Sequence, residues 1–302
     1  MFDRNCLKKM RGIVVPILTP IDEEEKIDEA KLREQVDFVI EGGVLGILAF
    51  GSNGEFYMVE EEEMLRALEI MLDQSKGRVP VFMGIGAVNT RIAARIAKAA
   101  EKAGAFGISV LQPMFLKPTE TELYQHFKEI AQTVPDMPML LYNNPGRTGY
   151  TMSADLVERL AGEIENIVGI KDSSGDMTQT EEFIRRTRKM DFKVFGGKDT
   201  LIYGALAHGA AGCVATTANF VPEMVVSIYD HYVSGDAESA REAQYALNPI
   251  RLLMDKASFP VATKDFANLA GREVGVPYRP NLPTSGHTLE LMKKAMEEAG
   301  VI

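Results

Sequence analysis

Residues 107–171 consist of three short, mostly apolar runs that alternate with two longer amphipathic ones: GISVL (107–111), TETELYQHFKEIAQT (119–133), MPMLLY (137–142), SADLVERL (153–160) and IVGIK (167–171). Short runs that stay apolar without alternating are typical of strands buried on both faces of a parallel sheet. The longer runs have apolar residues at helical spacing, and Thr119 with Glu122 predicts a capping box at the start of the first. We therefore predict a β-α-β-α-β segment.

The same alternation continues on both sides of this segment. Further strands are expected at 12–18, 44–50, 79–83, 192–195 and 211–215, and further helices at 28–41, 59–74, 90–103, 177–187 and 200–208. Asp28 and Ser153 are predicted to be N-caps. Eight successive strand–helix units predict an α/β fold, the (β/α)8 TIM barrel. An open, doubly wound sheet has the same alternation and is the alternative, but eight units without a break favour the barrel.

Beyond the eighth expected strand the sequence has only helical patterns, at 222–233, 237–254, 259–269 and 289–299. A barrel needs one helix after its last strand. The surplus predicts an appended region. We therefore divide the chain into a barrel with the catalytic site (residues 1–221) and a C-terminal helical region (residues 222–302).

The composition is that of a soluble globular protein, with 302 residues, 46% hydrophobic and 25% charged. The net charge of −10 argues against a nucleic-acid partner, which needs a basic surface. The longest apolar stretch, 42–50, is too short for a membrane span. The basic N-terminus is not followed by an apolar run, so we expect no signal peptide.

Two cysteines, Cys6 and Cys213, argue against a disulfide scaffold and favour a reducing cytoplasm. The four histidines are scattered and lack the spacing of zinc ligands. We therefore expect neither a metal nor another cofactor, and a zinc-dependent aldolase is disfavoured.

Barrel enzymes place their active sites at the carboxyl ends of the strands. Lys171 ends one apolar run, where desolvation favours a free amine over an ammonium ion. Such an amine can attack a ketone and form an imine. Tyr142 ends the preceding strand, and its phenol can exchange protons near Lys171. The alternatives are a surface lysine that closes a strand and an aromatic ring that only packs the barrel end.

Two further junctions can bind carboxylates. Ser52 and Asn53 lie between glycines in GSNGE (51–55), where backbone N–H groups, a hydroxyl and an amide can surround an anion. Arg147, in a turn after a Pro-Gly pair, can bind a second carboxylate with two hydrogen bonds. The alternatives are a tight turn that caps a helix and an exposed loop arginine.

Together these motifs resemble the dihydrodipicolinate synthase and N-acetylneuraminate lyase family of pyruvate-dependent class I aldolases. The matching stretches occur in family order: GIVVPILTP (12–20), GSNGE (51–55), YNNPGRTG (142–149), GIKDSSGD (169–176) and GGKD (196–199). The resemblance implies a barrel with a C-terminal helical region, assembled as a homotetramer. It further implies that the substrates of the enzyme are a small 2-oxo acid and an aldehyde.

The resemblance also assigns roles to residues. It implies that Lys171 forms the Schiff base and that Tyr142 relays protons. Ser52 and Asn53 occupy the places of the pair that holds the pyruvate carboxylate. Two more positions, Gly197 and Val214, match residues that line the pyruvate pocket.

The choice of aldehyde depends on three positions. Arg147 matches the arginine that binds the carboxylate of aspartate semialdehyde in the synthases. The synthases have Thr-Thr where this sequence has Ser52-Asn53. A Ser-Asn pair is more like that of the hydroxy-oxoglutarate aldolases. Phe115 stands where the synthases have a tyrosine that reaches a neighbouring subunit and completes its proton relay.

The sequence therefore predicts a Schiff-base lyase or synthase, with dihydrodipicolinate synthase-like condensation of pyruvate and aspartate semialdehyde as the first choice. A 2-keto-3-deoxy sugar-acid aldolase or a 4-hydroxy-2-oxoglutarate aldolase is the close alternative. A keto-acid dehydratase on the same fold is a further one. A non-catalytic binding protein is the least favoured, and Phe115 is the residue that motivates it.

Overall fold

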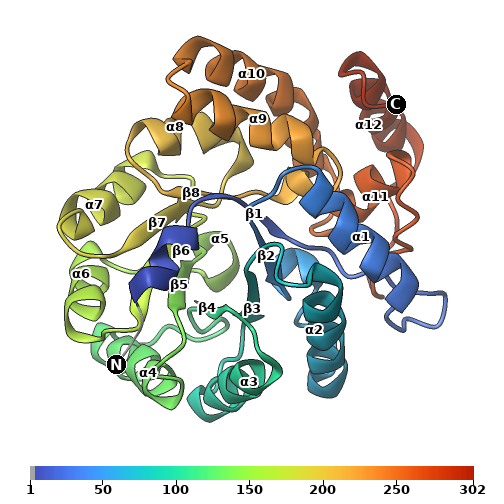
Figure 1. Cartoon of the computed structure of the whole chain (residues 1–302). Coiled ribbons are helices and arrows are strands. Elements are labelled where there is room, and N and C mark those ends of the chain that lie inside the picture. The colour runs from blue at the N-terminus through green and yellow to red at the C-terminus, as the bar shows by residue number, and fades with distance from the viewer. Residues whose placement is uncertain (1–3) are drawn as a thin grey trace.

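The computed structural model, which describes residues 4–302, contains a closed barrel of eight parallel strands (Figure 1). The strands are β1 (Gly12–Pro16), β2 (Gly46–Ala49), β3 (Val81–Ile85), β4 (Gly107–Leu111), β5 (Met139–Asn143), β6 (Ile167–Asp172), β7 (Lys193–Gly196) and β8 (Gly212–Val214). Each pairs with its neighbours in the chain, and β8 pairs with β1. The predicted barrel is confirmed, and the open sheet is excluded.

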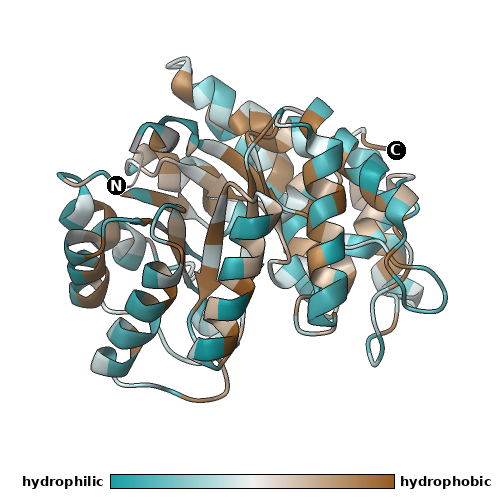
Figure 2. Ribbon diagram, turned by 60° about the horizontal axis from the view of Figure 1, so that its bottom comes forward, coloured by the Kyte–Doolittle hydropathy of each residue, from teal (hydrophilic) through white to brown (hydrophobic). Residues whose placement is uncertain are grey.

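A ring of helices surrounds the barrel, one after each strand. Seven of them are α1 (Glu29–Glu41), α2 (Glu61–Ser75), α3 (Thr90–Ala103), α4 (Glu120–Thr133), α6 (Ala154–Glu163), α7 (Met177–Thr187) and α8 (Ile202–Ala207). The predicted caps are present: Asp28 and Ser153 each accept a hydrogen bond from a first-turn N–H, and Thr119 with Glu122 forms the capping box. Figure 2 shows the resulting pattern, with hydrophilic residues outside and hydrophobic residues toward the strands.

The region after β8 contains α9 (Pro222–Val233), α10 (Ala237–Leu253), α11 (Val261–Leu269) and α12 (Gly286–Glu298). α9 follows β8 as the eighth helix of the ring, so α10, α11 and α12 are the addition. In Figure 1, α11 and α12 lie beside α1, outside the ring. The division of the chain at residue 221 stays a prediction. α9 begins directly after that boundary, but by its position it belongs to the ring.

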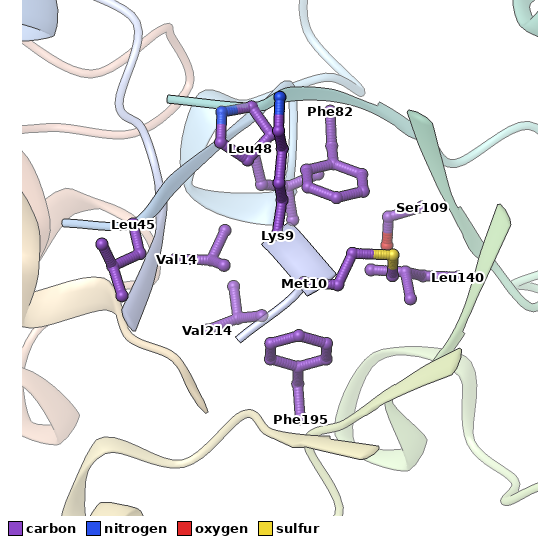
Figure 3. A pocket seen from close by; sticks show the side chains of 11 residues that line it. Lys9, Met10, Val14, Leu45, Leu48, Phe82, Ser109, Leu140, Phe195 and Val214 are labelled. Carbon is purple, nitrogen blue, oxygen red and sulfur yellow. The ribbon is translucent and has the colours of Figure 1, made fainter. Parts of the chain in front are cut away.

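Apolar side chains form two separate clusters. One lies between the strands and the helices. The other fills the barrel interior and includes Val14, Leu140 and Phe195. At the amino-terminal ends of the strands the short helix η1 (Arg4–Lys9) crosses the barrel opening, and Met10 points inward toward Ser109 and Leu140 (Figures 1 and 3). The cavity left there is about 10 Å³, which is about one water molecule, so this end of the barrel is plugged.

Several short elements were not predicted, and most of them follow strands at the opposite end. They are the helical turns η2 (Ser52–Gly54), α5 (Pro145–Thr148), η4 (Thr216–Asn219) and η5 (Met254–Lys256). A further turn, η3 (Asp199–Leu201), overlaps the start of the helix predicted at 200–208, which the structure divides into η3 and α8. Elements of three or four residues are too short to show a helical period in the sequence. β1 also ends earlier than predicted, because the N–H of Leu18 bonds to the Asn219 side chain instead of a strand neighbour.

Two further findings concern membrane spans and clusters of metal ligands. Within residues 4–302, no helix is long and apolar enough to cross a membrane, and no three His, Cys, Asp or Glu side chains gather as metal ligands would. Cys213 is a buried free thiol, whereas the side chain of Cys6 lies outside the described part.

Candidate active site

A cavity of about 450 Å³ opens at the carboxyl ends of the strands. The structure brings all seven predicted site residues to its wall: Ser52, Asn53, Tyr142, Arg147, Lys171, Gly197 and Val214. The remaining wall includes residues that the sequence did not single out, from the end of α10, from the segment between α10 and α11 and from α11 itself: Arg251, Met254, Asp255, Ala257, Phe259, Pro260, Ala262 and Thr263. The C-terminal region therefore closes one side of the cavity.

Lys171 faces this cavity because β6 contains one extra residue. Met139 pairs with Ile167, but the next residue, Leu140, pairs with Gly169, so Val168 is a bulge. A bulge shifts the alternation of side chains by one. Without it, Ile170 would face the barrel interior and Lys171 the surrounding helices.

The Lys171 side chain is buried, with 3% of its surface exposed. It pairs in register with Tyr142 across β5 and β6, and its Nζ lies 4.2 Å from the centre of the Tyr142 ring. It makes no ion pair with any carboxylate of residues 4–302. The interpretation as a surface lysine is therefore wrong.

The Tyr142 hydroxyl is the centre of a small hydrogen-bond network. It accepts a hydrogen bond from Asn144 Nδ2 at 2.8 Å, and the nearby hydroxyls of Ser52 and Ser173 also lower its pKa. Burial raises the pKa of this phenol, but the charge of Lys171 and these hydrogen bonds outweigh burial and leave the pKa below its usual value. Tyr142 is thus more than a packing residue. Its hydroxyl gives up a proton more readily than an ordinary phenol.

Ser52 and Asn53 lie on η2, directly after β2, and both are buried. Asn53 Nδ2 donates to Thr216 Oγ1, and Asn53 Oδ1 accepts from Thr263 Oγ1, each at 2.9 Å. The next long helix, α2, begins only at Glu61, with Glu60 as its N-cap. The pair therefore does not cap that helix, and its polar groups are directed to the cavity wall.

Arg147 lies on α5, and its guanidinium stacks on the ring of Phe259, with its carbon 4.0 Å from the ring centre. No carboxylate within the described chain pairs with it. Stacking occupies one face of the guanidinium and leaves its N–H edges free. Arg147 can therefore accept a carboxylate that enters the cavity.

Gly197 and Val214 shape the floor. A Cβ on Gly197 would lie 2.1 Å from Ser173 Oγ, so any larger residue there would displace the Ser173 hydroxyl, which donates to the Gly197 carbonyl at 3.3 Å. Val214, the last residue of β8, lines both this cavity and the small one at the plugged end (Figure 3). It separates the two.

Phe115 lies away from the cavity of its own chain. Its side chain is fully exposed, and its backbone has a positive φ of 72°, which is unusual for an aromatic residue. Within this chain the Tyr142 hydroxyl accepts its hydrogen bond from Asn144.

Comparison with known proteins agrees with this geometry. Residues 9–299 match the Dihydrodipicolinate synthetase family. The chain belongs to this family. Among curated relatives, the 4-hydroxy-tetrahydrodipicolinate synthase of Methanopyrus kandleri is 35% identical, covering 97% of this chain and 98% of the relative. That of Trichlorobacter lovleyi is 37% identical, covering 94% and 98%.

Solved structures of the family have the same fold. Dihydrodipicolinate synthase from Thermotoga maritima superimposes with a TM-score of 0.93 at 31% identity, covering 97% of this chain and 99% of the other. A prophage protein of the family from E. coli K12, solved in complex with pyruvate, gives 0.92 at 28% identity, with coverage of 97% and 99%. The family resemblance seen in the motifs is thereby confirmed over almost the whole chain.

Proposed function

We propose that this chain is a pyruvate-dependent Schiff-base synthase that condenses pyruvate with aspartate semialdehyde. The single observation that supports this best is a buried amine, Lys171, next to a phenol of lowered pKa, Tyr142, in a cavity of the family fold. The relatives named 4-hydroxy-tetrahydrodipicolinate synthase, at about 35% identity over nearly the full chain, point the same way.

The proposed reaction begins with attack of the neutral Lys171 amine on the ketone carbon of pyruvate. The resulting carbinolamine loses water and becomes a protonated imine. Tyr142 takes and returns protons in these steps, which its position beside Nζ allows. Tyr142 then takes a methyl proton, which gives an enamine. The enamine carbon attacks the aldehyde carbon, whose oxygen takes up that proton, and water finally adds to the imine, releases the product and regenerates the amine.

The pyruvate end of the cavity is assigned to Ser52 and Asn53, whose hydroxyl and amide are held near Tyr142 and Lys171. The assignment of pyruvate is supported by the related E. coli K12 protein, which was solved with pyruvate bound. Gly197 and Val214 form the floor against which the small methyl ketone would lie.

The acceptor end is assigned to Arg147. Its unpaired guanidinium on the cavity wall favours an aldehyde that carries a carboxylate, such as aspartate semialdehyde. An aldehyde without an anionic group would leave the N–H donors of Arg147 bonded only to water.

An aldolase for a 2-keto-3-deoxy sugar acid or for 4-hydroxy-2-oxoglutarate is the second candidate. Ser52-Asn53 in place of Thr-Thr favours it, and a cavity of about 450 Å³ is large enough for such substrates. A dehydratase would use the same imine but release neither pyruvate nor an aldehyde. A binding protein without catalysis has no use for the buried Lys171–Tyr142 pair.

We also propose a homotetramer in the cytoplasm. Phe115 and its neighbour Leu116 are exposed apolar side chains, and a second copy of the chain would cover them. One solved relative is described as a monomeric dihydrodipicolinate synthase variant, so sedimentation analysis is the appropriate test. The low cysteine content favours a reducing compartment, which fractionation of the source cells would test.

A substrate panel tests the proposed activity. We expect purified protein with pyruvate to consume aspartate semialdehyde much faster than aldehydes that lack a carboxylate. Preference for a hydroxylated sugar acid, with release of pyruvate, would support the second candidate instead. Water elimination without pyruvate or aldehyde would indicate the dehydratase.

A further inference from the structure

We propose that Thr263 and Lys264, neighbouring residues on α11, hold the carboxylate-binding segment 51–55 in its working position. They are positioning residues that act through Asn53 and Glu55. This inference rests on the proposed function, because it takes Ser52 and Asn53 as the pyruvate carboxylate site.

The first contact is made by Thr263. A side-chain amide presents one acceptor and two N–H donors. The acceptor end of Asn53 would repel a carboxylate, but Thr263 Oγ1 donates to it at 2.9 Å and occupies it. Thr216 Oγ1 takes one N–H of the amide, also at 2.9 Å. One N–H therefore remains, which can donate to a carboxylate in the cavity.

The second contact is an ion pair between Lys264 and Glu55. Lys264 Nζ lies 2.8 Å from Glu55 Oε2, and the two side chains are 1% and 0% exposed. Nζ also donates to the carbonyl of Val276 at 2.8 Å, and the N–H of Tyr278 donates to Glu55 Oε1 at 3.2 Å. The end of the segment is thus bound to the C-terminal region on several sides.

The backbone of the segment needs such support. Glu55 has a φ of 54°, in the left-handed region that residues other than glycine rarely occupy. Gly54, just before it, is fixed by a hydrogen bond from Thr19 Oγ1 to its carbonyl at 2.9 Å. The carboxylate site is therefore built jointly by the barrel and by α11.

Thr263→Val tests the first contact, because valine keeps the shape of threonine and removes the hydroxyl. The readout is the pyruvate concentration that half-saturates borohydride trapping on the protein. We expect this concentration to rise about fivefold to twentyfold, with the trapped amount at saturation unchanged. Thr263→Ser, which keeps the hydroxyl, should restore the wild-type value.

Thr187→Val is the matched control. Thr187 is also a buried helical threonine, and its hydroxyl donates to the carbonyl of Phe183, away from the cavity wall. We expect this variant to leave half-saturation within twofold of wild type. An equal rise in both variants would show a general structural effect and overturn the inference.

A double variant shows whether Thr263 acts through Asn53. Asn53→Ala alone should weaken pyruvate binding, and adding Thr263→Val should then weaken it by less than twofold more. Full additivity of the two effects would overturn the inference.

The wild type separates this inference from the proposed function. If wild-type protein traps pyruvate on Lys171 but Thr263→Val has the wild-type half-saturation, only the inference fails. If the wild type traps no pyruvate, the proposed function fails as well.

Discussion

At the scale of single residues, the proposed chemistry depends on the closeness of Lys171 and Tyr142. Nζ lies over the phenol ring, and the phenol has a pKa below its usual value. A phenol beside the attacking amine is well placed to exchange protons with it during imine formation.

Tyr142→Phe removes the proton relay and leaves the ring. We expect turnover to fall by about 10²- to 10⁴-fold, the usual size of a general acid–base contribution. Steady-state rates measure it. Tyr124→Phe is the control, since that hydroxyl bonds Glu163 and Tyr124 is not on the cavity wall. Turnover within twofold of wild type in Tyr142→Phe would contradict the assigned role.

The pH profile reports the pKa of the same phenol. The hydrogen bond from Asn144 stabilises the ionised form and so lowers this pKa. Asn144→Ala should therefore raise it and move the Tyr142 limb of the rate profile to higher pH. A limb that stays in place, or that moves to lower pH, would show that Tyr142 does not control the profile.

Arg147 is expected to act on one substrate only. Arg147→Gln removes the charge, and we expect the KM of the carboxylated aldehyde to rise about tenfold to a hundredfold, since a charged hydrogen-bond pair is lost. Half-saturation with pyruvate should change by less than twofold. Arg251→Gln, on the same wall but paired with Asp255, is the comparison. Equal effects on both substrates would contradict the assignment.

At the scale of elements, short irregularities place the site. The bulge at Val168 turns Lys171 inward, and helical turns after β2, β5, β7 and β8 form the rim. These features occupy few residues, yet they decide which side chains meet. The long helices mainly cover the barrel.

The caps of those helices should affect stability without affecting the site. Thr119→Ala removes the capping box of α4 and should cost about 1 kcal/mol of unfolding free energy. Thermal unfolding measures this loss, and turnover should stay at the wild-type level. Thr133→Ala, at the other end of the same helix, should cost less. An unchanged midpoint for Thr119→Ala would contradict the cap.

Sequence periodicity was sufficient for the strands and for the long helices. It also predicted that Lys171 and Tyr142 lie near the ends of adjacent strands, and the pairing of β5 with β6 confirms this. It could not predict the role of Thr263 or Phe259, because their partners Asn53 and Arg147 lie far away in the chain. The bulge at Val168 was equally hidden, since one inserted residue leaves an apolar run apolar.

At the scale of the whole molecule, the C-terminal region forms part of the cavity wall as well as an addition to the barrel. The buried pair of Lys264 and Glu55 connects the two parts at the rim. A buried ion pair adds little net stability by itself, but the loss of one partner leaves the other charge without compensation.

Lys264→Met should therefore destabilise the protein by about 3–5 kcal/mol, measured by urea unfolding. Adding Glu55→Gln removes the uncompensated charge and should restore a large part of that loss. Lys293→Met is the control, since Lys293 is an exposed lysine of α12. A double variant that is less stable than Lys264→Met would contradict this interpretation of the pair.

The most direct measurement is the position of the covalent adduct. Protein incubated with pyruvate is reduced with borohydride, digested and analysed by peptide mass spectrometry. The account predicts a reduced pyruvyl adduct on Lys171, and none in Lys171→Ala, whose turnover should be lost. An adduct on another lysine, no adduct at all, or wild-type turnover in Lys171→Ala would contradict it.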